Sequence, residues 1–375
     1  MLTVYFWTIL VWVVILTTGS VLRKKRLGKP LFYIAYALFL VLVIEATSLI
    51  GLRFKTGHWL FDEKFNSNVL LFEPHPYMVG VPRANKHVTL KDITYTHNSK
   101  GFRGKEPAAV KQKKRIVTVG GSTTYGTNVS DWETWPYYLD SLAHEQYEVL
   151  NFGIPGHTTV EHIVQASLIV PEYKPDIVFI HCGLNDLRNL FVKDLAVDYS
   201  DFHARKLYGI YGFCPTNEMP RIATLRLAVL VMQKMKLYPT CTYYKGNLAE
   251  DHSIQAMEKA LHLYKRNLYT LAAIYRSQGV ELVFIPQVLR KEAFKDNKLK
   301  WWIPYVKDEE LEDVMALYNQ TMKEVADSVH AGYAQSILEA PWTTADFKDP
   351  SHLNAPADLR FARILQAELI AGDKH

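Results

Sequence analysis

The chain has 375 residues, with 43 Lys and Arg against 38 Asp and Glu, a net charge of +5. Its 49% hydrophobic and 22% charged residues exclude a disordered chain, a collagen-like chain and a polytopic transporter. The charge is uneven, because residues 1–52 hold five basic residues and one acidic residue, a net of +4. The remaining 323 residues carry only +1, so the basic balance does not indicate binding to nucleic acid.

Two apolar runs open the chain. In residues 1–18, 14 of 18 side chains are apolar, and in residues 31–50, 17 of 20 are apolar. A helix needs about 20 mostly apolar residues to cross the hydrocarbon core of a bilayer. We therefore expect a transmembrane helical hairpin within residues 1–52, with helices at about 2–18 and 31–51.

The link between the two runs, residues 19–30, contains all five basic residues of this segment. Short loops rich in Lys and Arg stay in the cytoplasm. A two-pass protein with an extracytoplasmic main domain, periplasmic or extracellular, is expected. Two alternatives remain: a cleaved signal peptide, although the first run lacks a positive leading region, and a buried core helix for the second run. Glu45 lies near the outer end of the second run, where a shallow interfacial position is expected.

Three cysteines, Cys182, Cys214 and Cys241, are too few for a disulfide scaffold. In an exported domain Cys214 and Cys241 could pair. The equal alternative is that all three thiols are unpaired. Cys182 ends an expected strand and is assigned to the core. Sequons at Asn128 and Asn319 matter only in a host that glycosylates.

After a lead-in segment at residues 53–113, rich in Pro, His, Asn and aromatic residues, a regular alternation begins and fills residues 114–375. Short apolar runs predict strands, and amphipathic stretches predict helices. The strands are expected at Arg115–Gly120, Glu148–Phe152, Asp176–Cys182 and Glu281–Ile285, and the helices at Trp132–His144, Thr159–Val170, Ile254–Ser277, Glu309–Ser328 and Ala357–Ile370. Strands that alternate with helices indicate a parallel sheet covered on both faces.

A segment at about 187–250 interrupts this alternation and is too long for an ordinary connection. We interpret it as a cap-like insertion. Its stretch Ile222–Leu237 is apolar with scattered Arg and Lys, so it packs on the core or touches the bilayer surface, and packing is the preferred interpretation.

Polar residues follow the expected strands, at the edge where ligands collect in open α/β sheets. The first strand runs into Gly-Gly-Ser-Thr-Thr, residues 120–124, and the second into residues 151–159, Asn-Phe-Gly-Ile-Pro-Gly-His-Thr-Thr. The third ends at His-Cys-Gly-Leu-Asn-Asp, residues 181–186, and Asp-Pro-Ser-His-Leu-Asn occupies residues 349–354. Each piece alone is compatible with a turn or a helix cap.

Together, the order and spacing of these pieces resemble the SGNH hydrolase superfamily, also called GDSL esterases and lipases. Ser122 matches the nucleophile block, Gly156 the second block and Asn185 the third, while Asp349 and His352 match the final Asp-x-x-His. The resemblance covers about residues 113–371. It implies a three-layer α/β/α fold with a mostly parallel, flavodoxin-like sheet.

The nucleophile block departs from the family pattern, because Gly121 stands where many members carry Asp. This departure weakens any inference about the substrate. The stretch Asn98–Gly104, Asn-Ser-Lys-Gly-Phe-Arg-Gly, also resembles the lead-in of membrane-anchored members.

The resemblance implies a role for each matched residue. His352 would accept the proton of Ser122, and Asp349 would orient the imidazole. The backbone N–H groups of Ser122 and Gly156 and the side-chain amide of Asn185 would form the oxyanion hole.

No cofactor and no metal are expected. His157 and His162 are five residues apart, which on a helix places them about 140° apart and prevents them from sharing a metal. The expected function is a membrane-anchored serine esterase that acts on an acetyl or acyl ester of an envelope glycan, an exopolysaccharide or a lipid. The alternatives are an O-acyltransferase that works with a membrane-bound acyl-donor partner, or a non-catalytic glycan- or lipid-binding scaffold.

Overall fold

The computed structural model describes residues 2–22, 24–25, 28–56, 59–60, 71–90, 92–200, 222–235, 237, 250–294, 303 and 306–372. The chain forms two compact units, and each is considered by itself. The first comprises Met1–Ser67 with Cys214–Thr242, and the second comprises Asn68–Phe213 with Tyr243–His375. Cys214 and Cys241, and therefore their expected pairing, lie outside the described residues.

The first unit is helical, with α1 (Leu2–Val21), α2 (Gly28–Thr56) and α8 (Ala223–Lys234). Helices α1 and α2 are antiparallel neighbours: the indole of Trp12 donates a hydrogen bond of 2.8 Å to the carbonyl of Ala35. The Trp12 ring also stacks on Phe39 at 5.7 Å. Both helices expected from the apolar runs are present. The apolar stretch that contains α8 packs on α2, a partner that the sequence did not suggest.

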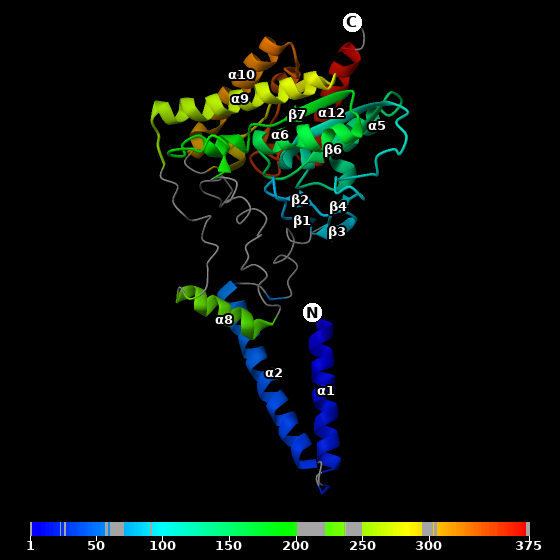
Figure 1. Cartoon of the computed structure of the whole chain (residues 1–375), viewed down its shortest axis with the longest axis vertical. Helices are drawn as coiled ribbons and strands as arrows, with labels where there is room; N and C mark the ends of the chain where they lie inside the picture. The colour runs from blue at the N-terminus through cyan, green and yellow to red at the C-terminus, as the bar shows by residue number, and fades with distance from the viewer. Residues whose placement is uncertain are drawn as a thin grey trace. The chain divides into compact units, whose positions relative to one another are not determined.

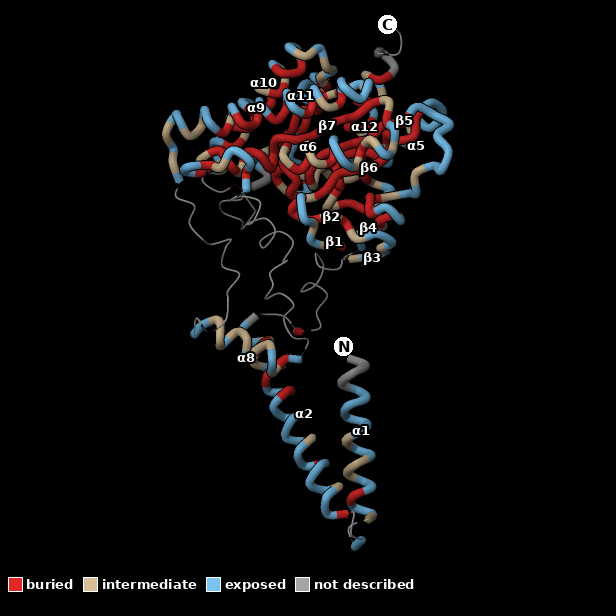
Figure 2. Tube along the Cα trace, viewed as in Figure 1, coloured by how far each residue is buried: buried red, intermediate tan, exposed pale blue. Residues whose placement is uncertain are grey.

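Among the described residues, the segment Gly28–Lys55 of α2 is long and apolar enough to cross a membrane. The apolar part of α1, Phe6–Val21, is shorter. Most residues of both helices whose burial is described are exposed (Figure 2), which is unlike the core helix of a soluble protein. By length and composition, α2 is a candidate for a membrane anchor or a signal sequence.

The second unit is built on a parallel sheet of five strands. These are β5 (Lys114–Gly120), β6 (Tyr147–Gly153), β7 (Ile177–His181), β8 (Glu281–Ile285) and β9 (Gly332–Tyr333). Their spatial order is β6-β5-β7-β8-β9, the flavodoxin-like order. Gly120 pairs with Gly153 and with His181, so three strands end at the same level of the sheet.

Helices cover both faces of this sheet (Figure 1). One face carries α6 (Thr159–Leu168), α9 (Ile254–Ser277) and α10 (Leu311–Val329), and the other carries α5 (Trp135–Leu142), α11 (Ser336–Glu339) and α12 (Ala355–Gly372). Alternate side chains of β7 enter the two cores: Val178 and Ile180 pack with the first layer, Ile177 and Phe179 with the second. The expected three-layer α/β/α fold is confirmed.

Local signals explain where the helices begin. The helix expected at Trp132–His144 starts later, because residues 131–133 form a 3₁₀ turn and the Thr134 hydroxyl accepts a hydrogen bond from the Tyr137 N–H. Helix α9 starts as expected, since the Ser253 side chain accepts from the Ala256 N–H. Further short elements are α4 (Ser122–Tyr125) and 3₁₀ turns at Val170–Tyr173, Asp186–Asn189, Lys291–Phe294, Asp308–Glu310 and Thr344–Asp346.

The lead-in segment contains two antiparallel strand pairs that the sequence did not reveal. Strand β1 (Phe72–Glu73) pairs with β2 (Val81–Pro82), and β3 (Lys86–Leu90) pairs with β4 (Ile93–His97). Single bridges from Arg103 to His97 and to Asn151 connect the β3–β4 hairpin with the edge strand β6. The hairpin therefore belongs to the same compact unit as the sheet.

Candidate active site

The residues matched by motif gather at the carboxyl edge of the sheet. Ser122 begins α4 directly after β5, and Gly156 lies in the loop that follows β6. Asn185 follows β7 and begins the next 3₁₀ turn. His352 lies just before α12, at the far end of the sequence. The parallel register places these strand ends side by side, so four distant segments meet at one place.

A continuous chain of hydrogen bonds connects Ser122, His352 and Asp349. The Nε2 atom of His352 lies 2.7 Å from the Ser122 hydroxyl oxygen. Its Nδ1 atom lies 2.7 Å from each carboxylate oxygen of Asp349. With Nδ1–H donating to the carboxylate, Nε2 is an acceptor for the serine proton. The distances are those of a nucleophile, a general base and a carboxylate that orients the base.

The Asp349 carboxylate is held in its ionised form by its surroundings. Burial by itself raises its pKa, but the neighbouring His352 and hydrogen bonds from the His352 ring and from the backbone of Ser351 and His352 lower the pKa to about 2. The backbone N–H groups of Ser351 and His352 donate to Oδ1 at 3.1 and 3.0 Å. Asp349 is therefore a carboxylate near neutral pH, as the partner of a histidine base must be.

Three of the matched segments approach each other beside Ser122. The side-chain amide of Asn185 donates to the backbone carbonyl of His157, the residue after Gly156, at 3.0 Å. Gly156 has a φ of +78°, a conformation that favours glycine. A Cβ atom at Gly121 would lie only 2.6 Å from Nδ2 of Asn185. The second glycine of Gly-Gly-Ser therefore allows the Asn185 amide to approach the nucleophile loop.

Asn128 is a member of this site that the sequence did not reveal. Its side-chain amide donates a hydrogen bond of 2.8 Å to Oδ2 of Asp349. The only signal at this position was a glycosylation sequon. The other sequon asparagine, Asn319, is buried, and its amide group exchanges hydrogen bonds with the backbone of Gln287. Both asparagine side chains thus have structural partners.

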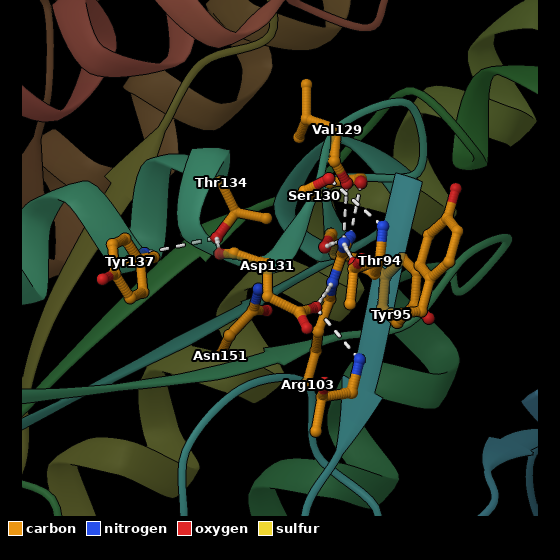
Figure 3. Close-up of polar contacts among 12 residues, drawn as sticks. Thr94, Tyr95, Arg103, Val129, Ser130, Asp131, Thr134, Tyr137 and Asn151 are labelled. Atoms are coloured by element: carbon orange, nitrogen blue, oxygen red, sulfur yellow. Dashed lines mark hydrogen bonds and ion pairs between the residues drawn. The ribbon is translucent and has the colours of Figure 1, made fainter. Parts of the chain in front are cut away.

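Arg103 organises the loop that carries Asn128 (Figure 3). Its buried guanidinium donates to the carbonyls of Tyr125, Gly126, Val129 and Thr94, and to the carboxylate of Asp131 at 2.8 Å. The ring centroids of Tyr95 and Tyr125 lie 4.6 and 4.7 Å from its Cζ atom, and the two rings stack on each other at 6.1 Å. The sequence singled out the stretch around Arg103 but gave this residue no role.

His157 and His162 are closer than the helical argument predicted. His157 precedes α6, so it is not on a helix with His162, and the two ring centroids are 6.2 Å apart. Within the described part of the chain, no three His, Cys, Asp or Glu side chains form a metal-binding group. Cys182 is buried with a free thiol, and burial raises its pKa well above the usual value.

The sequence also matches a known protein family. Residues 118–358 match the model of the GDSL-like lipase/acylhydrolase family. The comparison with curated proteins gave no significant match.

Solved structures similar to the chain include several that are 10–16% identical to it. TesA is 13% identical, with 68% of this chain and 98% of that chain covered and a TM-score of 0.40. A catalytic variant of Axe2, an acetylxylan esterase from Geobacillus stearothermophilus, is 14% identical, with 69% and 95% covered and a TM-score of 0.39. The esterase EstA from Pseudoalteromonas sp. is 10% identical, with 70% and 100% covered and a TM-score of 0.40.

Proposed function

The chain belongs to the GDSL-like lipase/acylhydrolase family, and from this premise we propose that it hydrolyses esters through Ser122, His352 and Asp349. An ester-bond hydrolase is the activity of the family. The assignment of the three residues rests on one observation, the unbroken chain of 2.7 Å contacts from the Ser122 hydroxyl through His352 to the Asp349 carboxylate.

In the proposed reaction, Nε2 of His352 accepts the Ser122 proton while the serine oxygen attacks the ester carbonyl carbon. The carbonyl oxygen becomes an oxyanion, which the N–H groups of Ser122 and Gly156 and the amide of Asn185 stabilise. When the tetrahedral intermediate collapses, the imidazolium gives its proton to the leaving alcohol and an acyl-serine remains. Water, deprotonated by the same imidazole, then attacks the acyl carbon; the bond to the serine oxygen breaks, the acid leaves, and the imidazolium returns its proton to Ser122.

Asp349 contributes by its charge and its position. As a carboxylate it keeps the proton of the neutral imidazole on Nδ1, so that the acceptor nitrogen Nε2 faces Ser122. It also stabilises the positive imidazolium that forms in each half-reaction. Its depressed pKa of about 2 means that it performs both tasks over the whole range in which the fold is expected to work.

The proposed location is the outer face of a membrane, with α1 and α2 as a two-pass anchor. The basic link between the two helices supports this orientation. The proposed substrates are acetyl or acyl esters of an envelope glycan, an exopolysaccharide or a lipid. Glu45 does not favour a membrane-bound acyl-donor partner, because its carboxylate accepts a hydrogen bond from Ala223 of the same chain.

Hydrolysis of p-nitrophenyl acetate by the full chain tests the assignment. Ser122→Ala should reduce turnover to the background rate, while Ser167→Ala, at an exposed position of α6, should not change it. Equal rates for Ser122→Ala and the unaltered protein would contradict the nucleophile. Protease protection in sealed vesicles tests the topology, because cleavage of the sheet domain only from the cytoplasmic side would contradict the proposed orientation.

A further inference from the structure

Helix α8 carries apolar side chains on two opposite sides. Its first apolar side, with Ala223, Leu227 and Leu230, packs against Leu49 and Leu52 of α2, together with Leu60. These three positions follow the i, i+4, i+7 spacing of one helical face. This side accounts for the attachment of α8 to α2.

The start of α8 is fixed to α2 by a buried carboxylate. Oε1 of Glu45 accepts a hydrogen bond of 2.6 Å from the Ala223 N–H. Oε2 accepts from the Thr224 N–H at 2.9 Å and from the Thr224 hydroxyl at 2.7 Å. A carboxylate at a helix N-terminus satisfies N–H groups that have no partner within the helix, and it interacts favourably with the helix dipole.

The position of Glu45 sets the depth at which α8 begins. Glu45 lies within the apolar run of α2, eight residues before Arg53, the first basic residue of the last turn. At 1.5 Å per residue, this separation is about 12 Å along the helix axis. If α2 crosses a bilayer, the N-terminus of α8 therefore lies below the level of the charged end of α2, at the boundary between headgroups and acyl chains.

The second apolar side of α8 faces away from α2. At roughly 100° per residue, Leu225, Ala228, Val229 and Met232 lie opposite the packed side. No charged residue interrupts this side within α8. Leu225 is 51% exposed, and Ala228 is exposed as well. On α2 itself, the apolar residue Val41 is 60% exposed.

We infer that α8 is an interfacial helix that lies in the outer leaflet of the bilayer, with its Leu225 side among the lipid chains and its N-terminus tethered by Glu45. The inference rests on the proposed membrane anchor. A lipid surface fits because the helix is apolar on the free side and begins at an interfacial depth on a membrane-crossing helix. It also accounts for an acid in an apolar run, since three hydrogen bonds compensate the carboxylate for the loss of water.

Photo-crosslinking to lipid tests this position. The full chain, with p-benzoylphenylalanine at one position, is reconstituted in vesicles of phosphatidylcholine and phosphatidylglycerol, irradiated and examined by mass spectrometry. The probe at Leu225 should form lipid adducts at a yield comparable to the probe at Val41 on α2. A probe at Leu168 of α6, which is 62% exposed, serves as the control that should form none.

The outcomes separate the inference from the anchor on which it rests. Adducts at Val41 but not at Leu225 would overturn the interfacial position of α8 and leave the anchor intact. Absence of adducts at both positions would overturn the anchor itself. A protein adduct at Leu225 in place of a lipid adduct would overturn the inference, because it would show that this side of α8 contacts a protein partner and not the bilayer.

A second variant tests the tether. Glu45→Gln keeps the shape of the side chain but removes its charge, so the Leu225 adduct should decrease while the Val41 adduct stays constant. An unchanged Leu225 yield would show that Glu45 does not hold α8. Hydrolysis of p-nitrophenyl acetate reports in each variant that the sheet domain is folded.

Discussion

The side-chain amide of Asn128 donates a hydrogen bond of 2.8 Å to Oδ2 of Asp349, a residue 221 positions further along the chain. The other oxygen, Oδ1, accepts from two backbone N–H groups of its own loop. Asn128 thus joins the loop that follows Ser122 to the loop that carries Asp349 and His352. It fixes the direction in which the carboxylate faces His352.

Asn128→Ala should lower kcat by about ten- to a hundredfold, because a hydrogen bond to a charged group contributes roughly 1.5–3 kcal/mol. Asn128→Asp should lower it further, since a second carboxylate beside Asp349 raises the pKa of one of them. The loss in this variant should be larger at pH 5 than at pH 8. Steady-state kinetics and the thermal midpoint measured together check this prediction. If kcat falls only in proportion to a fall in Tm, Asn128 does not position Asp349.

Arg103→Lys should reduce both stability and turnover. Lysine keeps the charge but has a single three-donor ammonium, so it cannot satisfy the five acceptors that the guanidinium serves. We expect a loss of about 3 kcal/mol in the free energy of unfolding, as for disruption of a buried charged network, and a lower kcat because the loop of Asn128 moves.

Arg115→Lys is the matched control. Arg115 is also buried and also multidentate, with Glu148 and the carbonyls of Tyr173 and Ala108 as acceptors, but it lies at the opposite end of β5 from Ser122. This variant should lose comparable stability and keep its kcat. Equal losses of kcat in the two variants would show that Arg103 acts on the fold alone.

Gly121→Ala should reduce turnover by about 10²–10³-fold, the usual cost of one lost oxyanion donor. The new Cβ would lie 2.6 Å from Nδ2 of Asn185 and displace the amide. Asn185→Ala should have an effect of the same size. Because both changes remove the same interaction, the double variant should be no slower than the single ones. If the losses of the two single variants multiply in the double variant, Gly121 acts through an interaction other than the one with Asn185.

Two buried histidines should make the fold sensitive to acid. Burial lowers the pKa of His181 to about 4, although the Ile285 carbonyl beside its ring opposes this shift. Burial lowers the pKa of His97 to about 4 as well. The ordinary histidine pKa is 6.5, so between pH 6.5 and pH 4 the unfolded chain binds protons that the folded chain does not. The free energy of unfolding should therefore fall as the pH decreases through this window, by roughly 3 kcal/mol for each histidine.

Urea unfolding at pH 7, 6 and 5 measures this dependence. His181→Asn retains a donor to the Ile285 carbonyl and does not titrate, so it should flatten the slope of stability against pH. His97→Gln keeps a hydrogen-bonding side chain beside the Tyr125 hydroxyl and does not titrate, so it should also flatten the slope of stability against pH. Slopes unchanged in both variants would exclude the two histidines as the cause.

The sequence was sufficient for four of the five strands and for the matched motifs, because both depend on local patterns; β9, with only two residues, was missed. Uniformly apolar runs gave β7 and β8 almost to the residue, since strands buried on both faces leave few alternatives. In a parallel sheet the strand ends share one edge, so the meeting of Ser122 with Asn185 followed from the order of the elements.

Contacts between distant segments could not be predicted in this way. The β3–β4 hairpin is short and half exposed, and its pattern Lys-His-Val-Thr-Leu in β3 lacks a strong apolar side. Arg103 lies in a loop, where a charged residue is ordinarily solvated, and only the fold shows that the carbonyls around it need its donors. Glu45 resembled a residue at the membrane interface, and its partner comes from an insertion 178 residues later.

Arg103 precedes the first strand of the sheet, yet it holds the loop that follows Ser122. The contacts that hold the candidate site are therefore not all contained within residues 118–358, the span that matches the family. Transfer of that span alone into another protein would remove the guanidinium that donates to the carbonyls of Gly126 and Val129. The shortest segment that contains all of these contacts therefore begins before residue 118 and includes the β3–β4 hairpin and Arg103.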